Sequence, residues 1–115
     1  MKSVIVIDDD EDTVRLFSEF LEENNIHVLG KGHDGKMAVE LFQGKKPDCV
    51  LIDIMMPNGS GFYAINKIRE LDPKAKIIAV TGDGRVTTEQ KLSKLKIPMV
   101  YKPFKMAEIV SKIQN

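Results

Sequence analysis

The sequence of 115 residues lacks tryptophan, has a single cysteine, and contains no long apolar run. Because Cys49 has no second cysteine with which to form an internal disulfide, the cysteine content fits a reducing compartment. A membrane-spanning helix needs about 20 apolar residues, and the N-terminus carries no signal-peptide pattern. These absences favour a cytoplasmic protein with no membrane partner, and the length fits one domain over residues 1–115.

The sequence also lacks a net charge, since 17 basic residues balance 17 acidic ones. Residues 1–84 nevertheless carry an excess of five acids, and residues 85–115 carry an excess of five bases. Nucleic-acid-binding modules are strongly basic overall, so this balance argues against direct binding of nucleic acid. The basic segment 85–115 fits either a docking face for an acidic partner or lysines that only solvate two helices.

Three short apolar runs are present instead of long ones. Residues 4–7, 49–52 and 77–80 are mostly β-branched and show no polar alternation. Parallel strands that are buried on both faces have this pattern. Two weaker runs, residues 26–29 and 98–101, mix apolar and polar side chains and suit the edges of a sheet, where Pro98 is tolerated.

Between these runs the apolar residues recur with the period of a helix. Asp34 is expected to cap the second helix, which should close near Gly44, and Asp72-Pro73 should end the third. Thr87 and Gln90 have the spacing of a capping box and predict the start of the fourth. The five stripes are formed by Val14, Phe17 and Leu21 with Leu16 and Phe20 beside them; by Ala38, Leu41 and Phe42; by Phe62, Ile65, Ile68 and Leu71; by Leu92 and Leu95; and by Met106, Ile109, Val110 and Ile113.

The order is a strand followed by a helix, repeated five times. Such alternation predicts an α/β fold with a parallel sheet and right-handed crossovers. Three interior runs and two edge runs match the flavodoxin-like (βα)5 arrangement, with strand order 2-1-3-4-5 and helices on both faces of the sheet.

Polar side chains follow four of the predicted strands where each strand ends. Asp8 and Asp9 follow the first strand, and Asp53, Thr81 and Lys102 lie at the ends of the third, fourth and fifth. Ligands of open α/β sheets bind at this edge, so we expect the five side chains to lie close together. The neighbouring acids, Asp10, Glu11 and Asp12, are interpreted as charges that complement a helix N-terminus.

The residue types at this edge favour phosphoryl chemistry. Three crowded carboxylates repel one another by about 4 kcal/mol per close pair, and a hard cation relieves that repulsion. A set of ligands that are all oxygen favours Mg²⁺, which also binds phosphate oxygens. A carboxylate can act as a nucleophile and become an aspartyl phosphate. Lys102 would then neutralise phosphoryl charge, and the Thr81 hydroxyl would donate a hydrogen bond to a phosphoryl oxygen.

Four stretches of the sequence, VIVIDDD, LIDIMMPNGSG, AVTGDG and VYKPF, resemble the signatures of response-regulator receiver domains, in order and across nearly the whole chain. The resemblance implies that Asp53 is the phosphoacceptor and forms a 4-aspartylphosphate. It also implies that Asp9 and Asp53 bind Mg²⁺ directly, that Asp8 acts mainly through water, and that the backbone carbonyl of Met55 is a further ligand. The bond between Lys102 and Pro103 would be cis, as is usual in the family.

The function implied is that of a two-component response regulator. The phosphoryl group would come from a sensor histidine kinase or a phosphotransfer protein, and the chain would catalyse only its own phosphorylation and dephosphorylation. Phosphorylation would change the affinity of the 85–115 face for an output protein or a fused effector domain.

One position departs from the family pattern. Receivers commonly carry Tyr or Phe three residues before the lysine, where this chain has Met99, and Tyr101 lies instead on the strand face opposite Lys102. The switch would therefore involve Thr81, Met99 and Tyr101 with a small structural change around the last strand.

Two other functions remain open from the sequence. A receiver-like interaction module that works without phosphorylation is compatible with Met99. A haloacid-dehalogenase-like phosphatase would use Asp8 as its nucleophile in an Asp-x-Asp-x-Thr pattern, but position 12 is Asp and not Thr.

Overall fold

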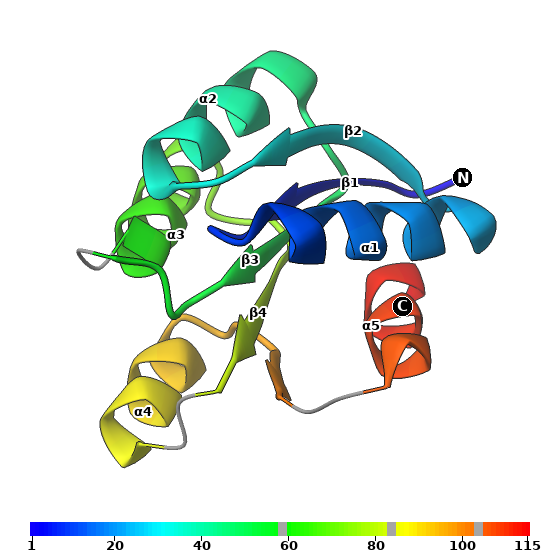
Figure 1. Ribbon diagram of the computed structural model, residues 1–115. Coiled ribbons are helices and arrows are strands. Elements are labelled where there is room, and N and C mark those ends of the chain that lie inside the picture. The colour runs from blue at the N-terminus through cyan, green and yellow to red at the C-terminus, as the bar shows by residue number, and fades with distance from the viewer. Residues whose placement is uncertain (58–59, 83–84, 103–104) are drawn as a thin grey trace.

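A parallel sheet of five strands lies between two layers of helices (Figure 1). The computed structural model describes residues 1–115 except 58–59, 83–84 and 103–104. The strands are β1 (Ser3–Ile7), β2 (His27–Gly32), β3 (Cys49–Asp53), β4 (Ile77–Thr81) and β5 (Met99–Tyr101). The helices are α1 (Glu11–Glu23), α2 (Gly35–Lys45), α3 (Ser60–Leu71), α4 (Val86–Lys94) and α5 (Met106–Gln114).

The strands are all parallel in the order β2-β1-β3-β4-β5, which confirms the flavodoxin-like prediction. The three continuous apolar runs form the interior strands, and every residue of β3 and β4 is buried. The two mixed runs form the edges. No helix in the described ranges has the length and apolar character needed to cross a membrane.

Each central strand contributes to two cores because successive side chains point to opposite faces of the sheet. One core joins Ile5, Ile7, Val50, Ile52, Ile77 and Ala79 to the apolar sides of α2, α3 and α4. The other joins Val4, Val6, Leu51, Ile78, Val80 and Val100 to α1 and α5. Cys49 lies in this second core as a free thiol, and burial raises its pKa to about 12, so the thiol stays protonated and unreactive.

Three predictions at helix ends are confirmed. Asp34 caps α2 by accepting a hydrogen bond from the Met37 amide at 2.8 Å, and α3 ends at Leu71, before Asp72-Pro73. Asp10 caps α1, with Glu11 and Asp12 in its first turn, as interpreted for these three acids. These contacts satisfy amides that the first turn of a helix leaves without partners.

Helix α2 also ends at Lys45, near Gly44 as predicted, and Lys46 takes the left-handed conformation (φ 48°) that ends it, just before Pro47. Other details of the helices were predicted wrongly. Helix α4 begins at Val86 with no side-chain cap, because Thr87 already lies in its first turn. Leu16 is 59% exposed and Leu71 is 49% exposed, since both lie off the buried stripes of their helices.

Candidate functional site

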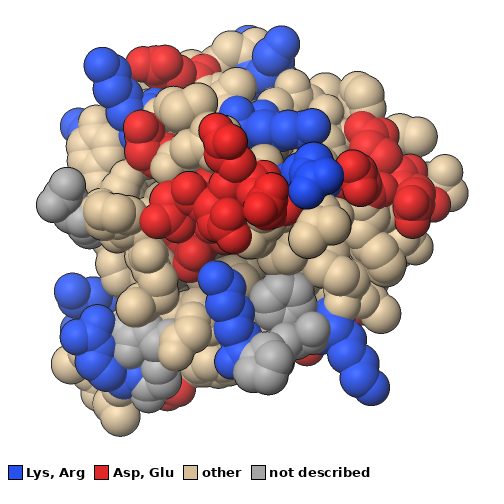
Figure 2. Space-filling view, in the orientation of Figure 1, with Lys and Arg blue, Asp and Glu red and all other residues tan. Residues whose placement is uncertain are grey.

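The carboxyl ends of four neighbouring strands bring the predicted site residues together. Asp8 follows β1, Asp53 ends β3, Thr81 ends β4 and Lys102 follows β5. Carboxylate oxygens of Asp8, Asp9 and Asp53 all lie within 4.8 Å of one another. In Figure 2 acidic side chains gather over the start of α1, with basic side chains around them. The sequence prediction that these residues share one edge of the sheet is confirmed.

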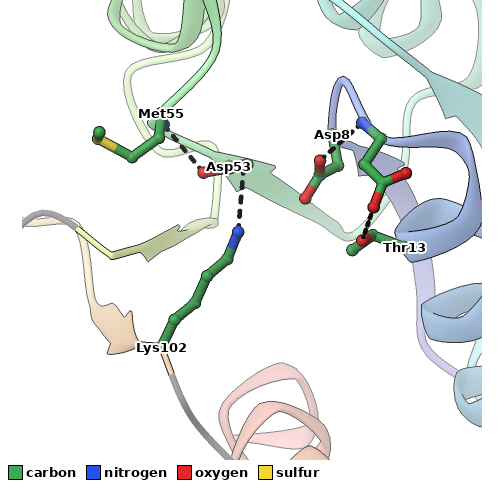
Figure 3. Close-up of polar contacts among 6 residues, drawn as sticks. Asp8, Thr13, Asp53, Met55 and Lys102 are labelled. Carbon is green, nitrogen blue, oxygen red and sulfur yellow. Dashed lines mark hydrogen bonds and ion pairs between the residues drawn. The ribbon is translucent and has the colours of Figure 1, made fainter.

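Asp53 is almost fully buried, at 4% exposure, and both of its carboxylate oxygens have partners. The Met55 amide donates to Oδ1 at 2.9 Å, and the Lys102 ammonium lies 3.3 Å from Oδ2. Figure 3 shows Lys102 extending from the end of β5 to this carboxylate, while Met55 approaches it from the loop after β3. A buried carboxylate held by one amide and one cation has a fixed orientation, as a nucleophile requires.

Asp8 is buried as deeply as Asp53 but is less well satisfied. Its Oδ1 accepts from the Asp10 amide at 3.0 Å, whereas its buried Oδ2 has no hydrogen-bond partner among the described residues. Burial raises the pKa of Asp8 to about 6, the Asp10 amide opposes this shift, and the Asp53 charge adds to it. The Oδ2 of Asp8, together with the nearby carboxylates of Asp9 and Asp53, forms a set of oxygen ligands that suits a hard divalent cation.

Asp10, two residues after Asp8, is a carboxylate in an exposed environment. It accepts from the Thr13 hydroxyl at 2.7 Å and from the Asp12 amide at 3.3 Å. The hydrogen bond from Thr13 is the main reason why its pKa is lowered. Asp8 and Asp10 are only two residues apart, but the pKa of Asp8 is raised and that of Asp10 is lowered.

The remaining predicted residues surround this centre. Thr81 is fully buried, and its backbone carbonyl accepts from the Lys102 amide at 2.9 Å. Met99 is half-buried, and the hydroxyl of Tyr101 donates to Glu89 of α4, on the other side of β5 from Lys102. The predicted cis bond before Pro103 lies outside the described residues.

Two contacts at the site were not predicted. His33 places its Nδ1 3.2 Å from the Asp8 carbonyl oxygen, so the β2–α2 loop supports the acidic loop after β1. The Gly35 amide donates to the Ser60 hydroxyl, which joins the starts of α2 and α3. A Cβ on Gly61 would lie 3.0 Å from the Asp53 carbonyl oxygen, so this glycine lets the start of α3 pack closely against the end of β3.

Comparisons with known proteins agree with this geometry. The family model described as response regulator receiver domain matches residues 4–114. The chain is 36% identical to protein CcdB of Bacillus subtilis, with 100% of this chain and 99% of that protein covered. It is 30% identical to chemotaxis protein CheY of Thermotoga maritima, with 99% and 96% covered.

Solved structures show the same fold at lower identity. A chain of the CheX–CheY–BeF3–Mg²⁺ complex from Borrelia burgdorferi has a TM-score of 0.89 at 22% identity, covering 98% of this chain and 87% of that one. A DNA-binding response regulator of the LuxR family from Staphylococcus aureus has a TM-score of 0.91 at 23% identity, covering 99% and 97%.

Proposed function

This chain belongs to the response regulator receiver domain family, and from that premise we propose that it is a Mg²⁺-dependent phosphoacceptor that is phosphorylated on Asp53. Receiver domains are signalling modules of two-component systems and not ordinary enzymes. The observation that best supports phosphorylation of Asp53 is the position of its buried carboxylate, next to Asp8 and Asp9 and 3.3 Å from the Lys102 ammonium.

The transfer step follows from these side chains. A carboxylate oxygen of Asp53 attacks the phosphorus of a phosphohistidine, the phosphorus–nitrogen bond breaks, and the imidazole leaves with its electron pair and takes up a proton. Lys102 neutralises charge on the phosphoryl oxygens, and the Thr81 hydroxyl donates to one of them. Attack of water on the acyl phosphate restores the carboxylate and releases phosphate. The chain thus catalyses only its own modification.

The acidic residues have a separate role. Receiver domains bind Mg²⁺ at an acidic pocket, and here Asp9, Asp53 and the Met55 carbonyl would hold the ion directly, with Asp8 acting mainly through water. When bound, the ion offsets the negative charge of the phosphoryl group and of the carboxylates. The orphaned Oδ2 of Asp8 supports this assignment, because a buried acceptor without a donor is costly until a cation or an ordered water reaches it.

Signalling needs partners on both sides of this reaction. A sensor histidine kinase or a phosphotransfer protein would supply the phosphoryl group. The output protein, or a fused effector domain, would bind the basic 85–115 face after Thr81, Met99 and Tyr101 adjust to the phosphoryl group.

Phosphorylation of Asp53 can be tested with a small phosphoryl donor and Mg²⁺. We expect intact-mass spectrometry to show one acid-labile phosphate on the wild type and none on Asp53→Asn. A phosphate that survives in Asp53→Asn but is lost in Asp8→Asn would contradict the proposal and favour the phosphatase mechanism. No phosphate on the wild type would favour an interaction module that works without phosphorylation.

The extent of the switch can be tested by NMR. Because Tyr101 is held to α4 through Glu89 and Met99 replaces the usual aromatic residue, we expect phosphorylation to shift amides near Asp53 and Thr81 strongly but residues 85–110 only weakly. Tyr101→Phe should enlarge the shifts in α4 by removing this hydrogen bond, whereas Tyr63→Phe on α3 should not. Large shifts throughout 85–110 in the wild type would contradict this expectation.

A further inference from the structure

A groove runs between α3 and α4 and ends beside the acidic site. It consists of two adjoining hollows, one of about 310 Å³ that reaches Met55 and one of about 270 Å³ that reaches Leu95. Phe62 and Lys91 line both hollows, so the two lie side by side and share one wall. Because its floor includes Ile54 and the side chains of Met55 and Phe62, the groove can accept an apolar group.

The charges along this groove have one sign. Arg85, Lys91 and Lys94 line it, and no Asp or Glu is found among its described lining residues. The acid of α4, Glu89, lies on the other side of the helix and accepts from Tyr101 of β5. Figure 2 shows basic side chains over α4 at the lower left of that view. The α3 side of α4 is therefore the more basic side.

Lys91 joins the apolar and charged parts of the groove. Its ammonium lies over the Phe62 ring, 5.2 Å from the ring centroid, so the charged group itself covers this apolar surface. An occupant with an acidic group could take this charge and uncover the Phe62 ring for an apolar side chain. Methionine side chains such as Met55, which is 51% exposed, adapt readily to an incoming apolar group.

We propose that the α3–α4 groove is a docking site for an acidic peptide segment of a partner protein, with an apolar side chain of that segment seated against Phe62 and its acids against Arg85, Lys91 and Lys94. Charge complementarity argues for an acidic occupant, and the apolar floor argues for a peptide side chain over a bare polyanion. This places the output contact on the α3 side of α4 and defines the chemistry of the partner.

The groove is also connected to Asp53. Met55 lines the groove, and its amide donates to the carboxylate of Asp53 at 2.9 Å. A phosphoryl group on Asp53 would change the acceptor of this hydrogen bond and so alter the floor of the groove. Docking and phosphorylation would then affect each other reciprocally. Only this link rests on the function proposed above; docking on the unphosphorylated chain does not.

The test is a selection from a display library of short random peptides on the intact, unphosphorylated chain. We expect the enriched peptides to combine acidic and apolar residues, and to bind roughly tenfold more weakly to the double variant Lys91→Glu and Lys94→Glu. A matched control, Lys45→Glu with Lys74→Glu, makes the same change in net charge at exposed sites outside the groove and should bind as the wild type does. Thermal unfolding of both double variants checks that they remain folded.

Mapping completes the experiment. Amide shifts caused by an enriched peptide should centre on residues 54–66 and 85–95. The proposal is overturned if no peptide is enriched over the charge-reversed variant, if the enriched peptides are basic, or if the shifts centre on α1, α2 or α5. Failure of Asp53 to take up phosphate would instead contradict the proposed function and leave the docking result intact.

The link to Asp53 has its own measurement. Adding BeF3 and Mg²⁺, as a substitute for the phosphoryl group, should change the affinity for the peptide about fivefold or more, and Asp53→Asn should abolish that change. Equal affinity with and without the substitute would overturn the link.

Discussion

Replacement of Asp8 by asparagine is expected to raise the free energy of unfolding of the metal-free protein by about 3 kcal/mol at neutral pH. Burial raises the pKa of Asp8 from 3.8 to about 6, so the folded protein pays for an ionised carboxylate that the unfolded chain solvates freely. Asparagine has no charge to bury. The asparagine Oδ1 can still accept a hydrogen bond from the Asp10 amide, and its side-chain amide NH2 can donate hydrogen bonds to the neighbouring carboxylates.

The pH dependence follows from the sign of this shift. Because the pKa of Asp8 is higher in the folded state than in the unfolded state, the folded state binds this proton more tightly. Its contribution to stability is fully present below pH 3.8, is lost as pH rises through about 6, and changes little above that. The gain from Asp8→Asn should therefore be small at the acid end of this window and largest above it.

Urea unfolding with a chelator present, at several pH values across this window, measures the effect. Asp10→Asn is the matched control, because it makes the same chemical change at an exposed cap, where asparagine also caps well. A gain of similar size in Asp10→Asn would contradict the assignment to burial. In the same variants, Mg²⁺ affinity should fall about 10- to 100-fold for Asp8→Asn and change little for Asp10→Asn.

The opposite effects of Asp8 on stability and on metal binding have one physical cause. Carboxylates crowded at a sheet edge repel one another and are poorly solvated, so a site built for a cation destabilises the fold without it. Lys102 offsets part of this repulsion, most directly at Asp53, but the Oδ2 of Asp8 has no hydrogen-bond partner among the described residues. The metal-free fold is less stable at this edge because its carboxylates are arranged to bind a cation.

The side chains that share the carboxyl edge of the sheet could be predicted from the sequence, because their positions depend on where the strands end. Asp53, Thr81 and Lys102 follow apolar runs whose parallel pairing forces their carboxyl ends together. Asp8 could be separated from Asp10 because only Asp8 directly follows a strand; the cap position of Asp10 follows from the helix that begins next. Pattern and topology are enough when a side chain's place is set by the backbone register.

Contacts between loops could not be predicted in this way. His33 reaches the Asp8 carbonyl, and Ser60 reaches the Gly35 amide, only because two loops are packed side by side. The hydrogen bond from Tyr101 to Glu89 likewise depends on the rotation of α4 about its axis. The capping-box prediction at Thr87 failed because α4 begins one residue earlier, at Val86, so that Thr87 lies inside the first turn.

Replacement of Lys102 by glutamine is expected to slow phosphoryl transfer from a small donor to Asp53 by about 10²- to 10³-fold. The lysine ammonium lies 3.3 Å from Asp53 Oδ2, on the side chain that would bear the phosphoryl group. Glutamine is one bond shorter than lysine and carries no charge, so it cannot neutralise charge as the reaction proceeds. The rate of phosphate uptake, followed by mass spectrometry at saturating Mg²⁺, measures the loss.

Mg²⁺ titration separates this role from a merely structural one. Removing a cation from beside Asp53 should leave Mg²⁺ affinity unchanged or make it tighter, because the ion no longer competes with the ammonium for the same carboxylate. Lys105→Gln, three residues further along at an exposed position, is the control and should alter neither quantity. A parallel loss of Mg²⁺ affinity and transfer rate in Lys102→Gln would show that the lysine holds the site together, and would refute its assignment to the phosphoryl group.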